Sequence, residues 1–332
     1  MTSEWRTIRV ADFIDFNPRL SLKKGAIATK VAMDKLKPFT KKIPETEKAE
    51  FNGGAKFCNG DTVMARITPC LENGKTSYID MLDDGEIGFG STEFIVMRAK
   101  TGISDPQFVY YTAINPVFRN VAIKSMVGSS GRQRVQQSVL EELELSVPNL
   151  DEQRRIGAFL AGLDEKIALN NRINDNLLAQ AQTLYKQFFP YGVQDDLPDG
   201  WRIGTVGEII EIHDSKRIPL SGADRTKMEK KIYPYYGAAS LMDFVDNYIF
   251  DGKYLLLGED GTVVDDAGYP ILQYVWGQFW VNNHAHILTG RLGYDVESLY
   301  MLFKQTPVKS IVTGAVQPKI SQANLRSVQV VI

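Results

Sequence analysis

Two glycine-containing loops carry side chains of the kind that contact nucleic acid. Residues 128–134 read Gly-Ser-Ser-Gly-Arg-Gln-Arg, and residues 314–319 read Gly-Ala-Val-Gln-Pro-Lys. Glycine and serine let the backbone approach phosphate closely, while arginine and glutamine can hydrogen-bond guanine and adenine edges. A solvent-exposed loop with incidental charges is the alternative. The candidate contacts are Ser129, Ser130, Arg132, Gln133, Arg134, Gln317 and Lys319.

Two basic stretches add to these candidates. Residues 19–48 contain nine basic and three acidic residues, a net charge of +6, and residues 214–231 have a net charge of +3. A solvated protein face is the simpler explanation of either stretch alone. Their matching distances from two similar Trp-Arg motifs favour contact with a polyanion. The candidates here are Lys23, Lys24, Lys216 and Arg217.

A third loop, residues 66–75, joins two strand-like runs and offers the same chemistry through Arg66, Thr68 and Lys75. In the second half of the chain, the run 233–237 supplies tyrosines beside small residues. Tyr236 is included as a candidate base contact, although aromatic side chains more often anchor a core.

Catalytic and metal-binding patterns are weak. His284 and His286 would share one face of a strand, but no third ligand lies nearby in sequence, and two cysteines make no zinc cluster. The run Gly258-Glu-Asp-Gly261 has the wrong spacing for a phosphate loop and is interpreted as a hairpin turn. The chain has no Asn-Pro-Pro-Tyr quartet and no P-loop. We therefore predict no catalytic residue and no metal site.

The elements that carry these loops are repeated. An opening motif recurs at an offset of 196 residues, and a closing segment, 135–147, recurs as 320–332 at an offset of 185. The alignment places Arg132 opposite Gln317, and Arg134 opposite Lys319. Two similar domains with different loops suit a target with two different half-sites. The opening motif comprises Trp5, Arg6, Val10 and Ile14, repeated as Trp201, Arg202, Val206 and Ile210.

Between the repeats, residues 149–189 predict one long helix. Asn149 and Glu152 fit a capping box, and Pro190 ends the pattern. Apolar residues in steps of four and three form a coiled-coil seam with two asparagines in its middle. About 39 residues span roughly 58 Å, or about 17 base pairs, which is long for an ordinary amphipathic helix on its own domain. The predicted interface residues are Ile156, Leu160, Leu163, Ile167, Asn170, Asn174, Leu177, Leu184 and Phe188.

Composition limits the remaining classes. The 332 residues predict two domains, and 44% hydrophobic with 23% charged residues is ordinary for a globular protein. The net charge of −2 argues against a general nucleic-acid coat. With no run of 18 apolar residues and no signal peptide, we expect a cytoplasmic protein without a membrane partner.

The run from Leu145 to Ile156, with Pro148, the Glu152-Gln153 pair and the later Leu163-Asp164 pair, resembles the central conserved region of the specificity (S) subunit of Type I restriction-modification systems. Residues 90–96, 201–206 and 282–288 resemble parts of that family's target-recognition domains. The resemblance covers essentially the whole chain.

The resemblance implies an α+β fold in which a long coiled-coil-type helix joins two similar target-recognition domains, with a pseudo-two-fold internal repeat. The expected parts are a first domain at 1–148, a helix at 149–190 and a second domain at 191–332. Strands are expected at 92–97, 254–257 and 284–288, and helices at 106–114 and 297–304.

The resemblance also implies a non-catalytic subunit that reads a bipartite double-stranded DNA target. Its partners would be methyltransferase (M) and restriction (R) subunits, which bind the cofactors S-adenosylmethionine, ATP and Mg. A nuclease or transferase, or a purely protein-binding scaffold, is the rival class.

Members of that family normally have a second helix after the second recognition domain, and this sequence ends at Ile332, where that helix would begin. We therefore expect that the apolar stripe of the central helix is covered by a second copy of the chain, as a homodimer, or by methyltransferase subunits.

Overall fold

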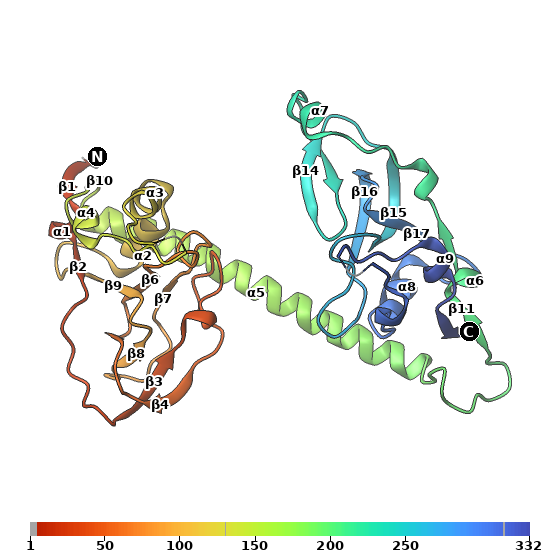
Figure 1. Ribbon diagram of the computed structural model, residues 1–332, viewed down its shortest axis with the longest axis horizontal. Coiled ribbons are helices and arrows are strands. Elements are labelled where there is room, and N and C mark those ends of the chain that lie inside the picture. Colours follow the sequence, from red (N-terminus) through yellow and green to blue (C-terminus); the bar gives the residue numbers. More distant parts are fainter. Residues whose placement is uncertain (1–4, 130, 315) are drawn as a thin grey trace. The chain divides into compact units, whose positions relative to one another are not determined.

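The computed structural model describes residues 5–129, 131–314 and 316–332 (Figure 1). These residues form two compact units, which divide between Arg172 and Ile173. The division lies inside the long helix α5 (Leu150–Phe188), whose bounds confirm the predicted helix. In the described part of the chain, no helix is long and apolar enough to span a membrane.

The first unit contains one two-stranded and two four-stranded sheets. The small sheet pairs β1 (Arg6–Arg9) with β10 (Glu144–Val147), so the opening and closing segments of the first repeat are antiparallel neighbours. The strand orders β2-β9-β6-β7 and β4-β3-β8-β5 describe the other two sheets. Their strands are β2 (Ile14–Phe16), β3 (Ile27–Val31), β4 (Glu47–Glu50), β5 (Ala55–Phe57), β6 (Thr62–Ala65), β7 (Thr76–Tyr78), β8 (Gly88–Gly90) and β9 (Phe94–Ala99). The helices are α1 (Val10–Phe13), η1 (Met33–Lys35), α2 (Pro106–Ile114), α3 (Pro116–Lys124) and α4 (Gln137–Glu141).

The second unit repeats this plan around a six-stranded sheet of order β12-β17-β15-β16-β13-β14. Its opening and closing strands, β11 (Ile203–Thr205) and β18 (Gln329–Val331), again pair antiparallel. The sheet strands are β12 (Ile210–Ile212), β13 (Tyr233–Tyr236), β14 (Leu241–Val245), β15 (Phe250–Gly258), β16 (Leu272–Val281) and β17 (Ala285–Gly290). The helices are α6 (Val206–Ile209), η2 (Asp214–Lys216), α7 (Gly222–Thr226), α8 (Val296–Phe303), η3 (Lys309–Ile311) and α9 (Gln322–Arg326).

Corresponding elements of the two units bury corresponding side chains. The order β2-β9-β6 matches β12-β17-β15, and α1, α2 and α4 match α6, α8 and α9. The central strands of these sets consist of apolar runs, such as residues 94–97 and 255–257, because both faces of the strand are covered. Phe108 of α2 and Leu299 of α8 pack into the main cores of their units. The predicted strands and helices are confirmed, with boundaries shifted by at most two residues except at β15, which begins four residues earlier than predicted.

The first turns of α5 are fixed to the first unit by polar contacts. Asn149 accepts a hydrogen bond from the backbone N–H of Glu152 at 3.0 Å, as predicted for the helix cap. The carboxylate of Glu152 pairs with Arg155 instead of completing a capping box. Gln153 is fully buried: its amide nitrogen donates to Pro148 O at 2.9 Å, and its oxygen accepts from the N–H of Asp105 at 3.1 Å.

The next turns of α5 pack closely on α2. Gly157 is buried, and a Cβ at this position would lie 2.7 Å from a carboxylate oxygen of Asp105 and 2.9 Å from Cβ of Gln107. Ile156, predicted for a partner interface, packs partly against the core of its own unit. Two turns later, the Tyr111 hydroxyl donates to Asp164 at 2.5 Å. This side of the helix therefore belongs to the domain.

Gly157→Ala should destabilise the first unit by about 1–3 kcal/mol, because the added methyl group overpacks the contact with α2. Gly162→Ala is the matched control in the same helix, because nothing lies within 4 Å of its Cβ position. It should stabilise by up to about 1 kcal/mol through helix propensity. Calorimetric unfolding of both variants tests this, and equal changes in stability would refute the close contact.

Candidate nucleic-acid interface

A hairpin in the first unit brings two of the predicted loops together. Val127 and Arg134 exchange backbone hydrogen bonds of 3.0 and 2.9 Å, which close the hairpin. At its base, the N–H of Gln133 donates to the Thr68 hydroxyl at 3.1 Å, and the N–H of Thr68 donates to Gln133 O at 3.0 Å. Ser129 and Arg132 are exposed towards the tip, and Ser130 lies outside the described residues.

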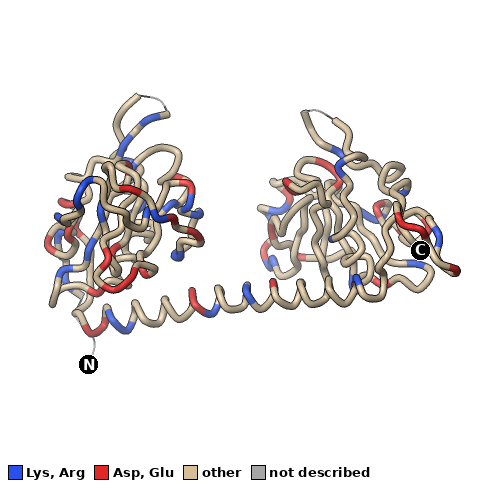
Figure 2. Tube along the Cα trace, turned by 90° about the horizontal axis from the view of Figure 1, so that it is seen from below, with Lys and Arg blue, Asp and Glu red and all other residues tan. Residues whose placement is uncertain are grey.

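The second unit has an equivalent hairpin. Thr313 and Lys319 exchange backbone hydrogen bonds of 2.9 and 2.7 Å, and the N–H of Gly261 donates to Pro318 O at 3.0 Å. Gln317 is exposed near the tip. In each unit, the hairpin projects on the side away from α5 (Figure 2). The sequence alignment of the two loops is therefore matched by equivalent positions in the fold.

A carboxylate holds the last cation of the first hairpin. Arg134 donates from Nε and Nη2 to both oxygens of Glu93, at 2.6–3.0 Å, and Arg66 Nε lies 4.0 Å from the same carboxylate. Hydrogen bonds from Arg134 hold the pKa of Glu93 below its usual value. The predicted residues Arg66 and Arg134 thus share one acid that the sequence analysis did not select.

In the second unit, the corresponding cation belongs to a larger cluster. Glu259 pairs with Lys319 at 3.2 Å and with Arg217 at 2.5 Å. Arg217 is mostly buried and also donates to the backbone carbonyls of Asp214 and Ala285. These bonds use much of the hydrogen-bonding capacity of the guanidinium, so Arg217 holds the surrounding protein segments together. Lys319, by contrast, is half-exposed.

Asp214 and His286 form the buried centre of this cluster. His286 Nδ1 lies 2.6 Å from Asp214 Oδ2, and Nε2 lies 2.8 Å from Ile320 O. Each ring nitrogen of His286 thus lies within hydrogen-bond distance of an oxygen atom. Asp214 also accepts from the N–H of Ile287 at 3.0 Å and from Gln322 at 2.6 Å. The cluster joins η2, β17 and α9.

The two histidines considered as metal ligands contact different carboxylates. His284 pairs with Asp260 at 2.5 Å, whereas His286 pairs with Asp214. Ligand-type atoms of Asp214, Glu259 and His286 do lie within 4.8 Å of one another. However, Arg217 and Lys319 already balance these carboxylates, which favours an internal ion cluster over a cation site.

The remaining predicted contacts lie apart from the hairpins or face inward. Lys23 and Lys24 are exposed just before β3, and Lys216 is exposed at the end of η2. Lys75 donates to Met33 O at 3.0 Å and so supports its own loop. Tyr236 packs against Phe279, with ring centroids 5.9 Å apart, in agreement with the interpretation of that tyrosine as core.

A second surface lies along α5. Most of the predicted seam is exposed, including Leu163 at 45%, Ile167 at 60% and Leu177 at 57%. Asn170 and Asn174 are exposed between these side chains, and Leu184 and Phe188 continue the apolar positions. These positions form the apolar stripe of α5. A stripe of this length suits contact with another helix.

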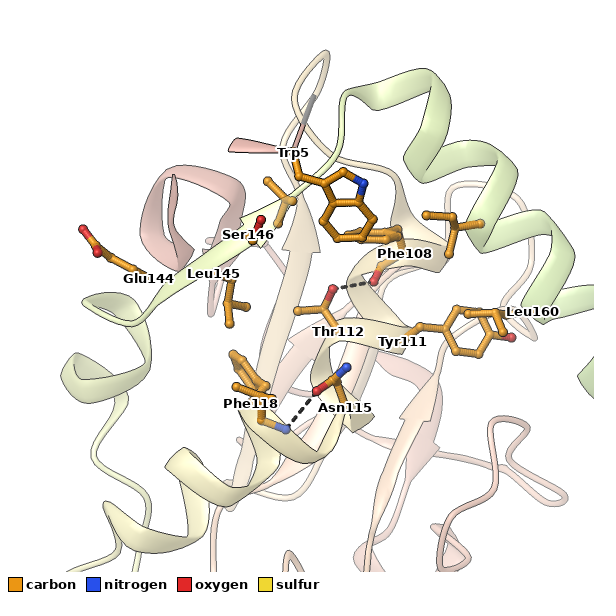
Figure 3. A pocket seen from close by; sticks show the side chains of 13 residues that line it. Trp5, Phe108, Tyr111, Thr112, Asn115, Phe118, Glu144, Leu145, Ser146 and Leu160 are labelled. Carbon is orange, nitrogen blue, oxygen red and sulfur yellow. Dashed lines mark hydrogen bonds between the residues drawn. The ribbon is translucent and has the colours of Figure 1, made fainter. Parts of the chain in front are cut away.

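An apolar pocket of about 520 Å³ lies beside the start of this stripe. Figure 3 shows Trp5, Phe108, Tyr111 and Leu160 around it, from the segment before β1, from α2 and from α5. Leu160 connects the pocket with the stripe along one helix.

At the equivalent position in the second unit, a smaller pocket of about 410 Å³ remains, and aromatic side chains cover its tryptophan. Trp201 contacts the rings of Phe189 and Tyr191, with centroids 6.0 and 5.4 Å apart, and Tyr185 stacks on Phe189 at 4.5 Å. Trp5, by contrast, is 54% exposed. The two repeats therefore differ at one equivalent site, where only the second tryptophan is covered by aromatic side chains from a helix end.

A family model for the Type I restriction modification DNA specificity domain matches residues 2–179 and 198–332. The chain belongs to this family. Two matches, one to each repeat, agree with the paired hairpins and the paired opening and closing strands. The resemblance that the sequence indicated is thereby confirmed.

Known specificity subunits share parts of this chain. The Type I restriction enzyme EcoAI specificity subunit of Escherichia coli is 36% identical over 104 residues, which are 31% of this chain and 18% of that protein. The MjaVIII specificity subunit of Methanocaldococcus jannaschii is 21% identical over 235 residues, 66% of this chain and 52% of that protein. The chain thus spans about half or less of these relatives.

The fold is also that of a solved specificity subunit. The crystal structure of the Type I restriction-modification S subunit from M. genitalium matches all of this chain and 85% of its own, with a TM-score of 0.58 and 16% identity. At this identity the likeness shows the shared fold.

Acid should destabilise the second specificity domain through Asp214 and Glu259. Burial raises the pKa of each carboxyl, but hydrogen bonds and positive charges from His286 and Arg217 outweigh it and hold both pKa values below their usual range. Unfolded, these groups titrate near about 4. Their contribution is therefore fully present above that pH and is lost as the pH falls through the lower folded-state values.

Urea unfolding between pH 7 and pH 3 measures this dependence, and tryptophan fluorescence reports mainly the second domain, which holds three of the four tryptophans. Glu259→Gln should lower stability at pH 7 by about 2 kcal/mol, because Arg217 loses its charged partner, and should flatten the acid dependence. A variant with an unchanged slope below pH 5 would contradict the assignment.

Proposed function

We propose that this chain is a non-catalytic subunit that reads a bipartite double-stranded DNA target, with one half-site for each specificity domain. The repeated hairpin is the observation that carries the proposal. In both domains it is docked by backbone bonds at its base and exposes Arg132 or Gln317 near its tip. Arginine suits guanine and glutamine suits adenine, so the two half-sites should differ.

The chemistry of the complex would belong to partners of this chain. Methyltransferase subunits would bind S-adenosylmethionine, and restriction subunits would bind ATP and Mg. The charged clusters described above support this division, because their carboxylates and cations are paired with each other. The rival enzymatic function predicts DNA cleavage or methyl transfer by the purified chain alone.

Hairpin variants test the reading of half-sites. In a complex of this chain with its methyltransferase partner, Arg132→Ala should lose discrimination at one base pair of one half-site, by about fivefold to 150-fold. Gln317→Ala should do so only in the other half-site. Methylation of a randomised DNA library, followed by sequencing, measures both effects.

Lys23→Ala is the matched control, because Lys23 is an exposed cation in a turn outside the hairpins. As a phosphate contact it should weaken binding equally across sequences and reduce the salt slope by about 0.9. If both hairpin variants behaved like this control, the hairpins would not read bases.

We also propose that the apolar stripe of α5 pairs with another helix, which sets the spacing between half-sites. The exposed leucines and isoleucines support pairing, and the two asparagines suit fixing of register. The pocket beside Trp5 supports a partner helix that ends there, because an equivalent helix end covers Trp201. The partner would be a second copy of the chain or a methyltransferase subunit.

Leu163→Asp should disrupt this pairing, because a charge in an apolar seam lacks a partner. Ala158→Asp, at an exposed position away from the stripe, loses similar helix propensity and is the control. Light scattering of the chain alone and with methyltransferase subunits measures the assembly. A wild-type chain that stays monomeric in both conditions at micromolar concentration would refute pairing through α5.

A further inference from the structure

The last cation of each hairpin is held by a carboxylate, but that carboxylate comes from different places in the two domains. Arg134 and Lys319 are equivalent, because each closes its hairpin and also forms a β-bridge to the loop at its base, at Ile67 and Asp260 respectively. Glu93 holds Arg134 and immediately precedes β9. Glu259 holds Lys319 and immediately follows β15.

The strand-end positions that are equivalent in the two domains carry side chains of different charge. The residue after β6, which matches β15, is Arg66, whereas the residue after β15 is Glu259. The residue before β9 is Glu93, whereas the residue before the matching β17 is His284. The acid has exchanged strands, while the pairing of a carboxylate with the hairpin cation is kept. What recurs is therefore the interaction rather than the residue position.

Fold stability alone does not account for this arrangement in the first domain. Arg134 is 45% exposed, and an exposed ion pair contributes at most about 1 kcal/mol. The pair does restrict direction, because Nε and Nη2 of Arg134 both donate to Glu93. Nη1 makes no hydrogen bond to any described residue and stays available on the hairpin that carries Arg132.

We propose that Glu93 and Glu259 are positioning residues for DNA recognition, which orient the last cation of each hairpin for specific contact. The inference rests on the proposed function. A guanidinium that is already held in one orientation loses less side-chain entropy on binding. The gain in binding free energy is therefore larger for a base or phosphate that matches this orientation than for one that does not. The carboxylate also lowers the local positive potential and weakens attraction to arbitrary phosphate. Each acid thus gives up affinity for any DNA and raises discrimination.

Glu93→Gln tests the proposal in the complex with methyltransferase subunits. A library of targets with single substitutions in each half-site gives the ratio of methylation at the intact target to that at each mismatch. The ratio should fall about threefold to tenfold at positions of one half-site, corresponding to one side chain that must now be ordered on binding. It should stay unchanged at the other half-site, while binding to unrelated DNA rises.

Two further variants separate positioning from charge and from folding. Arg134→Lys keeps the charge but cannot form the two-pronged bond, so it should lose the same discrimination and leave binding to unrelated DNA unchanged. Glu142→Gln removes an exposed carboxylate that pairs with Arg9 elsewhere in the same domain and should change neither quantity. Calorimetric melting of Glu93→Gln within a few degrees of the wild type would exclude a folding defect.

Several results would overturn the positioning role. If Glu93→Gln raised the binding affinity for all DNA sequences equally, Glu93 would act only through its negative charge. Unchanged mismatch ratios in Glu93→Gln or Arg134→Lys would show that the orientation of Arg134 does not matter. A wild-type complex without sequence preference would refute the proposed function itself, and the positioning role with it.

Discussion

Antiparallel pairing of the first and last strands is the constraint on which each specificity domain depends. Because β1 pairs with β10, the chain leaves the first domain beside the point where it enters, and α5 starts three residues after Val147. Gln153 then joins Pro148 to the start of α2 through a fully buried amide. Displacement of Pro148, which directly follows β10, would remove one hydrogen bond from that buried amide, which is costly. Domain closure and the direction of the helix are therefore coupled.

The same pairing also positions the two hairpins. In the first domain the hairpin closed by Val127 and Arg134 is followed within a few residues by α4 and then by β10. In the second, the order is the hairpin closed by Thr313 and Lys319, then α9 and β18. Short connections leave little freedom between the hairpin base and the closing strand. Tip residues can consequently differ between domains while the frame stays the same.

Local patterns predicted the frame, and long-range contacts decided the site. The repeated tryptophan motifs, the apolar runs and the seam of α5 follow from spacing alone, so those elements were predictable. In the sequence, Lys75 and Arg217 cannot be distinguished from exposed basic residues. In the fold, both donate hydrogen bonds to backbone carbonyls of the protein. The partners of Arg134 and Arg217 lie 41 and 42 residues away in sequence. The sequence does show an acid at the end of a strand at Glu93 and at Glu259. Its role as the partner of a hairpin cation could be recognised only once the hairpin and the neighbouring strand were placed beside it.

The two ion clusters show how one scaffold keeps an interaction while its residues change. A carboxylate after β6 would face Glu93 across the same small space, and two such acids would repel each other there. Arg66 avoids that repulsion in the first domain. In the second, Glu259 follows β15, the residue before β17 is His284, and Arg217 and Lys319 pair with the carboxylate. The acid thus lies before β9 in the first domain and after β15 in the second. Substitutions on the two strands and in the hairpin are therefore coupled. If the hairpin cation is replaced and the acid is kept, the acid loses its partner; if the acid is replaced and the cation is kept, the cation loses its carboxylate.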